Sequence, residues 1–368
     1  MTAPASASLS TPYRIGILTS GGDCPGLNAV IRGTVCAAET RGWEVLGFSD
    51  GYEGLLSPVR YRPLTVDNTH GITALGGTIL GTTNKGRFVA KVGLGDKALI
   101  PKEIISEARE TIEGLGISAL VCLGGDGSLT TAEQLFENGI PTIGVPKTID
   151  NDISATAMTF GFDSAVECVT EALDRLHTTA RSHKRVMILE VMGRHAGWIA
   201  LHGGIAGGAD MILIPEIPFS YEKICREIVH RVGNGHETTM IVVAEGAMPK
   251  EGTVSAKGGH KGEVRLGGIG QQVCDEIERR TGRETRTMVL GHLQRGGAPT
   301  TLDRILGTRF GVGAVKLIEE KKFGHMVSYI NDQIGSVSIP EAVGQLKTVP
   351  PGGQMVDAAR SIGITFGD

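Results

Sequence analysis

The stretch Ala119-Leu120-Val121-Cys122-Leu123-Gly124-Gly125-Asp126-Gly127-Ser128 decides the fold of this chain. Its unbroken apolar run is typical of a strand in a parallel sheet, with helices covering both faces. The glycines that follow let backbone N–H groups approach a polyphosphate, and Asp126 offers a carboxylate of the kind that holds Mg²⁺. A plain turn with a capping aspartate is the alternative explanation of the last five residues. We expect a nucleotide phosphate site at Gly125, Asp126, Gly127 and Ser128.

Other parts of the chain repeat this order of strand, glycine turn and helix. Residues 13–19 predict a strand, residues 20–26 a turn and residues 27–40 a helix. Gly22 in this turn is a second candidate for phosphate binding, although a structural turn explains it equally well. Further strands are expected at 44–48, 142–145, 185–191, 211–214, 240–244 and 287–290, and further helices at 103–114, 128–136, 165–180, 221–232 and 270–281. The alternation predicts an α/β fold of two doubly wound, Rossmann-like domains with mainly parallel sheets.

The composition describes a globular chain without a strongly charged surface. Its 368 residues suggest two domains at roughly 150 residues each, and 40% of the residues are hydrophobic. The formal net charge of −4 argues against a globally basic surface, so neither nucleic acid nor a membrane is expected as a partner. No apolar run approaches the roughly 20 residues that a membrane-spanning helix needs.

Cysteine spacing and the first residues indicate a cytoplasmic protein. The six cysteines stand singly, without a C-x-x-C pair, so we expect reduced thiols and neither a zinc site nor a disulfide framework. Residues 1–12 lack a basic start and an apolar core, which predicts a flexible tail rather than a signal peptide. The polar, glycine-rich residues 250–263 predict a surface loop.

The segment Lys147-Thr148-Ile149-Asp150-Asn151-Asp152 carries the most telling chemistry, because it places two carboxylates and a lysine directly after an apolar strand. One acid can take a proton from a substrate hydroxyl while the other helps to hold a metal ion. The lysine can neutralise a transferring phosphate. The alternative, a solvated charged loop, is weakened by the apolar strand before it.

A scatter of cations at the predicted strand ends indicates an anionic substrate. Arginine forks match phosphate oxygens through two parallel hydrogen bonds. Taken singly, each of these cations is explained as an ordinary surface residue; together they are not. The candidates are Arg185, Arg194, Arg286, His292 and Arg295. The chain has no G-x-x-x-x-G-K-[ST], H-E-x-x-H or G-x-S-x-G motif, so the phosphate site is not a P-loop.

Taken together, these motifs resemble the 6-phosphofructokinase family, and within it the bacterial type A, mixed-substrate group. The likeness runs from Ile15 to about Arg309. The matching segments are 19–28, 124–128, 146–152, 190–194, 282–286 and 291–297. The resemblance implies two α/β domains: one of residues 13–160 with about 295–345 for ATP and Mg²⁺, and one of 161–294 with about 346–368 for fructose 6-phosphate.

The resemblance also implies a role for each matching residue, with Asp150 as the base that deprotonates the sugar 1-hydroxyl. Catalysis is assigned to Lys147, Thr148, Asp150 and Arg194. Binding of the nucleotide phosphates and Mg²⁺ is assigned to Gly22, Lys85, Arg87, Gly125, Asp126, Gly127, Ser128 and Asp152, with Asp126 and Asp152 as the metal ligands. Binding of fructose 6-phosphate is assigned to Thr148, Asp150, Arg185, Met192, Gly193, Arg194, Glu245, Arg286, His292 and Arg295. Arg185 and Arg286 would reach the substrate of a neighbouring subunit, which implies a homo-oligomer, a tetramer or a dimer.

The phosphoryl donor is the choice that the residues leave open. Glycine at 127 suits ATP in this family, because an aspartate there would occupy the place of the α-phosphate and repel it. Lys147 points the other way, since pyrophosphate-dependent relatives carry lysine at this position. We expect ATP, because steric exclusion outweighs one added cation. The alternatives are a pyrophosphate-dependent phosphotransferase and a non-catalytic sensor of nucleotides or sugar phosphates.

The chain departs from its relatives in two places. Many relatives place an arginine soon after the stretch Gly76–Gly81, where this chain offers Lys85 or Arg87. Regulated bacterial relatives carry a second arginine one turn after Arg32, where Cys36 stands here. The loss of that phosphate ligand argues against ordinary effector control.

Overall fold

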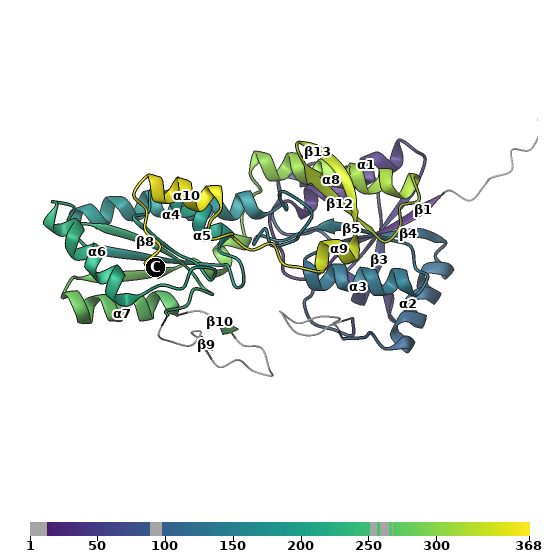
Figure 1. Cartoon of the computed structure of the whole chain (residues 1–368). Coiled ribbons are helices and arrows are strands. Elements are labelled where there is room, and N and C mark those ends of the chain that lie inside the picture. The colour runs from purple at the N-terminus through teal and green to yellow at the C-terminus, as the bar shows by residue number, and fades with distance from the viewer. Residues whose placement is uncertain (1–12, 89–97, 251–255, 258–264, 267) are drawn as a thin grey trace, which may run out of the picture.

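The computed structural model describes most of the chain, in the ranges 13–88, 98–250, 256–257, 265–266 and 268–368. The expected tail at 1–12, and all of the expected loop at 250–263 except residues 250 and 256–257, lie outside these ranges. Two helix-covered sheets lie side by side along the long axis of the molecule (Figure 1). The expected α/β class with mainly parallel sheets is confirmed.

The larger sheet has seven strands in the order β13-β12-β5-β4-β1-β2-β3. Its strands are β1 (Arg14–Thr19), β2 (Glu44–Phe48), β3 (Tyr61–Leu64), β4 (Ile117–Gly124), β5 (Thr142–Pro146), β12 (His325–Ile330) and β13 (Gln333–Ser338). The inner strands are parallel, whereas β3 and β13 close the two edges in antiparallel pairs. The hairpin β12–β13 and the strand β3 were not expected from the sequence.

Strand β4 confirms the expectation that both sheet faces are buried. Ala119 and Val121 pack into the core under α1 (Leu27–Glu39) and α8 (Thr301–Glu319). Leu120 packs into the opposite core. The helices over that core are α2 (Lys102–Gly114), α3 (Asp126–Glu137) and the short α9 (Ile339–Val343). Alternate side chains of a strand point to opposite faces, so a continuous apolar run is what this two-sided burial requires.

The smaller sheet has four parallel strands in the order β11-β6-β8-β7. The strands are β6 (Val186–Val191), β7 (Met211–Leu213), β8 (Thr239–Ala244) and β11 (Thr285–Val289). One face is covered by α4 (Phe162–His183), α5 (Trp198–Ala206) and α10 (Gln354–Ser361), and the other by α6 (Tyr221–Gly233) and α7 (Ile269–Thr281). The remaining elements are the 3-10 helices η1 (Gly51–Leu55), η2 (Ile72–Ala74) and η4 (Gly291–Arg295) and the strands β9 (Ala256–Lys257) and β10 (Arg265–Leu266).

The chain passes between the two sheets three times. It leaves the larger sheet after β5, returns after η4 to form α8, and leaves again after α9 to form α10 (Figure 1). Asp303, at the start of α8, accepts hydrogen bonds from the backbone N–H groups of Gly161 (2.9 Å) and Ser164 (2.8 Å) at the start of α4. The domain boundaries expected near residues 160, 294 and 345 stay a prediction.

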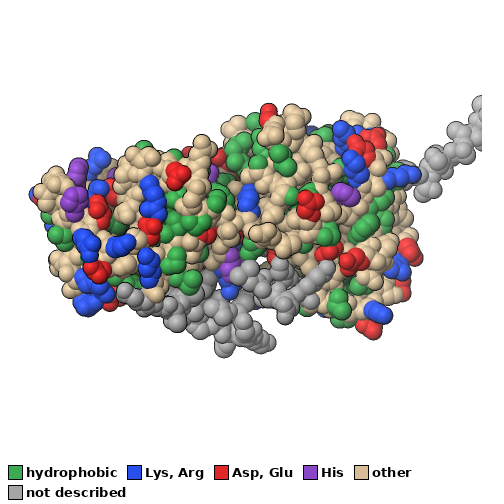
Figure 2. Space-filling view, viewed as in Figure 1, with side chains coloured by type: hydrophobic (Ala, Val, Ile, Leu, Met, Phe, Trp, Pro, Cys, Tyr) green, Lys and Arg blue, Asp and Glu red, His purple; other side chains and the backbone are tan. Residues whose placement is uncertain are grey.

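The surface carries charges of both signs. On the face shown in Figure 2, Lys and Arg side chains lie among Asp and Glu over the lobe that carries α6 and α7. Within the described ranges, no helix is both long enough and apolar enough to cross a membrane.

Candidate active site

A cavity of about 210 Å³ lies at the carboxyl ends of three strands of the larger sheet. Strands β4, β1 and β5 are parallel and adjacent to one another, β4 in the middle, so the turns that follow them meet at one edge. The lining residues include Gly21, Gly22, Lys85, Gly125, Asp126, Gly127, Ser128 and Lys147. Helix α3 begins here, with Gly125 as its N-cap. Its free N–H groups and positive dipole end suit phosphate oxygens.

The glycines of the first turn have two different roles, one in the backbone conformation and one in a close contact. Gly21 has a φ of 83°, which lies in the left-handed region that favours glycine. A Cβ atom added at Gly22 would lie 2.5 Å from Nη1 of Arg295, an arginine at the end of η4. The structure therefore brings the glycine turn and Arg295, which is expected to bind the sugar phosphate, together across about 270 residues of chain.

Lys147 is buried beside the same turn, with 5% of its surface exposed. Its ammonium group donates a hydrogen bond to the carbonyl of Gly22. Burial is the main cause that lowers the pKa of Lys147, and the nearby charges of Asp23 and Asp152 oppose that shift. The lysine therefore places a cation against the inner wall of the phosphate cavity.

Three carboxylates, those of Asp126, Asp150 and Asp152, lie at or near this cavity. The pKa of Asp150 is raised to about 7, first by burial and then by the charges of Asp152 and Glu245. The pKa of Asp152 is also raised, chiefly by burial, and Asp126 adds to the shift. Asp126 itself lines the cavity. Asp152 therefore lies within electrostatic reach of Asp150, and Asp126 within electrostatic reach of Asp152.

The Asp150 side chain is poised to accept a proton. Its Oδ1 atom is buried and has no hydrogen-bond partner within the described ranges. The loop around it is held by Thr148, whose Oγ1 accepts a hydrogen bond from the backbone N–H of Asp150 at 3.1 Å. A buried oxygen without a partner has an energetic cost that a bound ligand can remove.

These acids fit a magnesium ion that is shared with a bound phosphate. Within the described residues, no group of three or more His, Cys, Asp or Glu side chains could hold a metal by itself. Mg²⁺ is typically held by one or two carboxylates, substrate phosphates and water. Asp126 and Asp152, together with the unsatisfied oxygen of Asp150, match that smaller requirement.

The smaller sheet contributes polar groups from the carboxyl ends of β6 and β8. Met192, Gly193 and Arg194 follow β6, and the backbone N–H of Met192 donates to Oε1 of Gln294 at 3.3 Å. Glu245 follows β8, and its pKa is raised first by burial and then by Glu190. The charges of Arg194 and Arg295 lower that pKa again, so both arginines lie near Glu245.

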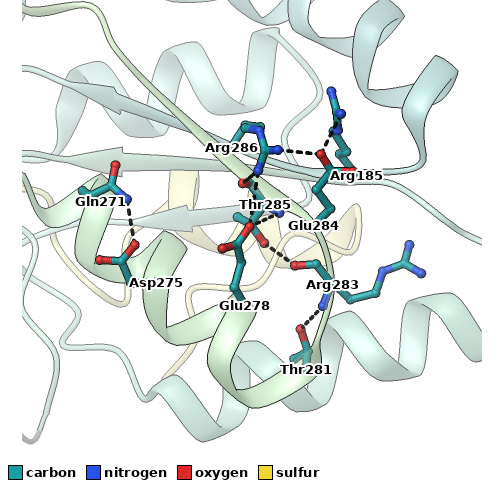
Figure 3. Close-up of polar contacts among 9 residues, drawn as sticks. All are labelled: Arg185, Gln271, Asp275, Glu278, Thr281, Arg283, Glu284, Thr285 and Arg286. Atoms are coloured by element: carbon teal, nitrogen blue, oxygen red, sulfur yellow. Dashed lines mark hydrogen bonds and ion pairs between the residues drawn. The ribbon is translucent and has the colours of Figure 1, made fainter.

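Two of the five cations expected at the carboxyl ends of strands do not lie there. This finding corrects the expectation that all five stand at corresponding strand ends. Arg185 immediately precedes β6, and Arg286 is the second residue of β11, so both stand at amino ends rather than carboxyl ends. Each pairs with Glu284 at 2.6 Å, as Figure 3 shows. Strand direction explains the error, because a residue before a strand and a residue after it lie on opposite edges of a sheet.

His292 is also set apart from the carboxylates. It is exposed on η4 and lines a separate hollow of about 760 Å³ beside α4. Arg295, one turn later, instead influences the pKa of Asp150 and Glu245. Within one chain, therefore, the structure joins Arg295 to the candidate site more directly than His292.

The structure distinguishes between Lys85 and Arg87. Lys85 lines the phosphate cavity. The side chain of Arg87 pairs with Glu53 at 3.2 Å, and its backbone N–H donates to Glu53 at 2.6 Å. Lys85 is therefore the better placed of the two to contact a phosphate.

Sequence reasoning missed an aromatic wall of the cavity. Tyr52 and Phe88 both line it, with ring centroids 5.5 Å apart, and the Tyr52 hydroxyl donates to the carbonyl of Ser128 at 2.8 Å. Tyr52 follows the carboxyl end of β2, a signal that the same rule about strand ends could have used. Phe88 had no comparable signal, because only tertiary packing brings it to Tyr52.

A glycine-lined cavity, a helix N-terminus and buried acids, in a fold of two mainly parallel sheets, define a class of phosphate-binding α/β proteins. Residues 14–318 match the model of the family described as phosphofructokinase, and this chain belongs to that family. It is 51% identical over 359 residues to an ATP-dependent 6-phosphofructokinase of Chloroflexus aggregans, covering 98% of this chain and 99% of that protein. It is also 48% identical to a pyrophosphate–fructose 6-phosphate 1-phosphotransferase of Amycolatopsis methanolica, covering 92% and 96%.

A solved structure supports the same assignment. The phosphofructokinase of Saccharomyces cerevisiae superposes with a TM-score of 0.76 and 31% sequence identity. The match covers 90% of this chain but only 45% of the yeast chain.

Proposed function

We propose that this chain is an ATP-dependent 6-phosphofructokinase. It transfers the γ-phosphoryl group of ATP to the 1-hydroxyl of fructose 6-phosphate and releases fructose 1,6-bisphosphate and ADP. The reaction is a step of glycolysis, which takes place in the cytoplasm. The identity of about 50% to proteins named ATP-dependent 6-phosphofructokinase, over nearly the whole chain, supports the proposal.

The environment of Asp150 is the observation that carries the proposal. Its buried Oδ1 has no partner among the described residues, and its pKa is raised to about 7. It follows β5 directly, beside the phosphate cavity and within reach of Arg295 and Lys147. A carboxylate in this setting can take the proton of the sugar hydroxyl as that oxygen attacks phosphorus.

The other residues bind and orient the reactants. The N–H groups at the start of α3 hold the nucleotide phosphates, while Lys147 and Lys85 balance their charge. Arg295, Glu245 and the turn Met192–Arg194 hold the sugar phosphate. As the oxygen–phosphorus bond forms, the bond to the leaving ADP oxygen breaks, and the proton passes to Asp150. Positioning and electrostatic stabilisation account for most of the catalysis in such transfers.

Asp126 and Asp152 would hold Mg²⁺ together with the nucleotide phosphates. The ion would neutralise the negative charge of the phosphate oxygens when it is bound. We propose that the larger-sheet domain, residues 13–160 with about 295–345, binds ATP and Mg²⁺. The smaller-sheet domain, residues 161–294 with about 346–368, binds the sugar phosphate.

We further propose that the active site is completed by a neighbouring subunit. Arg185 and Arg286 stand at the amino ends of their strands, away from Arg194 and Arg295. They could serve a substrate phosphate only in another chain's site. The protein would then be a homo-oligomer, a tetramer or a dimer, with shared sites.

Pyrophosphate as the donor is the second candidate. Lys147 is buried against the glycine turn, where it adds a cation close to the phosphates. The relative from Amycolatopsis methanolica bears a pyrophosphate-dependent name at 48% identity. Gly127 favours ATP, because it leaves room for the α-phosphate.

A coupled assay with matched concentrations of ATP and pyrophosphate tests the proposal. We expect fructose 1,6-bisphosphate to form with ATP and Mg²⁺ at a much higher kcat/KM than with pyrophosphate. Turnover with pyrophosphate alone would reverse the choice of donor. Binding of nucleotide and sugar phosphate without turnover by either donor would make the chain a sensor instead.

A further inference from the structure

The segment between α9 and α10 ties the candidate catalytic loop to the smaller sheet. It passes from one lobe to the other in Figure 1. The backbone N–H of Lys347 donates to the carbonyl of Asp152 at 2.8 Å. The carbonyl of Lys347 accepts a hydrogen bond from the indole N–H of Trp198, in α5, at 2.8 Å. Lys347 is thus fixed from both sides by its backbone.

The ammonium group of Lys347 is enclosed by the loop that follows β5. It donates hydrogen bonds to Oδ1 of Asn151 (2.9 Å) and to the carbonyls of Thr156 and Ala157 (3.0 Å each). It also lies 6.0 Å from the centroid of the Trp198 ring. Three acceptors and an aromatic face account for the whole donor capacity of a lysine and leave it little freedom.

Asn151 is the residue on which this lysine acts. Its φ is 51°, in the left-handed region, which asparagine enters more readily than most residues but less readily than glycine. Its Oδ1 accepts from Lys347 and also from the backbone N–H of Thr159 at 3.1 Å. These two hydrogen bonds hold the side chain of Asn151, and this residue lies between the two acids Asp150 and Asp152.

We propose that Lys347 is a positioning residue for phosphoryl transfer, which holds Asn151 in its left-handed conformation and so aims Asp150 and Asp152 at the reactants. The inference rests on the proposed function of Asp150. It assigns a role in the reaction to a residue about 200 positions away, outside every motif of the site. The same segment also connects the loop to the smaller sheet. The backbone N–H of Val349 donates a hydrogen bond at 2.8 Å to Glu216, which lies shortly after β7.

The test is the variant Lys347→Met, which keeps the length of the side chain and removes its charge and donors. We expect kcat to fall about 10- to 100-fold, the usual effect of losing a group that supports the ligands of a metal site, because Asn151 adjoins the proposed ligand Asp152. We expect KM for fructose 6-phosphate and for the donor to change much less, because the phosphate-binding groups remain. Lys347→Arg should recover part of kcat, since it restores a cation with several donors.

A double-mutant cycle with Asn151→Gly separates positioning from general loss of structure. Glycine adopts a positive φ without help, and it has no side chain for the lysine to hold. The effect of Lys347→Met on kcat should therefore shrink in the Asn151→Gly background. An equal fall in both backgrounds would overturn the inference. If Lys347→Met does not fold, Lys347→Gln, which keeps an amide donor, carries the same comparison.

A control variant and the wild type distinguish the possible failures. Lys322→Met removes an exposed lysine that pairs with Glu320, and it should leave kcat unchanged. A wild-type kcat in Lys347→Met would overturn the positioning role and leave the proposed function intact. A wild-type protein without turnover on any donor would overturn the proposed function itself.

Discussion

The two ends of the smaller sheet carry the same kind of residue in opposite circumstances. At the carboxyl ends, Arg194 lies near the partly buried Glu245, and Arg295 reaches across to the phosphate cavity. At the amino ends, Arg185 and Arg286 share Glu284 on the surface. Arginine alone therefore does not mark a binding site, and the end of the strand on which it stands decides what it can reach.

The energies of these ion pairs sharpen the contrast. The side chains of Arg286, Glu278 and Glu284 are 52%, 43% and 45% exposed, and exposed pairs contribute only about 0–1 kcal/mol. Such pairs can be exchanged for a phosphate at little cost. Arg295, in contrast, lies among buried groups, where its loss would leave Asp150 with only Lys147, and Glu245 with only Arg194, as a balancing charge.

The largest expected effect is at the carboxyl end of β5. Asp150→Asn should lower kcat by about 10²–10⁴-fold, because the amide cannot accept the proton of the sugar hydroxyl. KM for fructose 6-phosphate should change far less. Steady-state kinetics at saturating ATP measures this, with Asp174→Asn on the exposed face of α4 as the matched control. A variant with near-normal kcat would remove Asp150 from the role of base.

The next effect concerns the carboxyl end of β4. Gly127→Asp should lower kcat/KM for ATP by about a hundredfold or more, since a new carboxylate would stand near the nucleotide phosphates in a site of low dielectric. The matched change Lys147→Gly removes the cation that favours pyrophosphate. It should weaken pyrophosphate use more than ATP use. Unchanged ATP kinetics in Gly127→Asp would refute the steric argument.

A comparison of Arg295→Ala with Arg286→Ala tests the two ends of the smaller sheet directly. Each should raise KM for fructose 6-phosphate by roughly 10–100-fold, the cost of one charged hydrogen bond to phosphate. Only the effect of Arg286→Ala should depend on a second subunit. No change in KM for Arg286→Ala would place the sugar phosphate out of its reach.

Hybrid oligomers test whether the site of one subunit depends on Arg286 of its neighbour. A chain with Asp150→Asn, co-expressed with a chain carrying Arg286→Ala, should form some sites that contain both intact residues. High-affinity turnover should then return in the mixture, although each variant alone is impaired. A mixture no better than the sum of its parts would contradict shared sites.

The smallest expected effect is on stability and concerns Asp303, which connects α8 to α4. Burial raises its pKa to about 6, above the ordinary value of an aspartate. The folded state therefore holds an extra proton between about pH 4 and pH 6, and the free energy of unfolding should fall by about 2–3 kcal/mol as the pH rises through this window. Asp303→Asn should show a shallower slope than the wild type in urea unfolding measured from pH 4 to pH 7, while the raised pKa of Asp150 still contributes to the slope that remains. A parallel slope in the variant would assign the titration to another group.

Local pattern was enough for much of the fold. The apolar runs at β1, β4, β5, β6 and β8 predicted strands because both of their faces are buried. The hairpin β12–β13 was missed because its burial is uneven and β13 is an edge strand of the sheet. Helix α8 was missed although Thr300 caps it, because its glycines, of which Gly307 and Gly311 pack closely on α1, obscure the helical pattern.

The sequence by itself determined the glycine turns, the acidic loop at Asp150 and Asp152, and the family to which they point, because each is a short motif whose chemistry depends on adjacent residues. Only the tertiary structure decided which cations face those acids, that Lys85 rather than Arg87 lines the cavity, and that Lys347 holds Asn151. These are contacts between distant segments. Strand direction and the crossing of the chain between two sheets set them, and neither is encoded in any single stretch of residues.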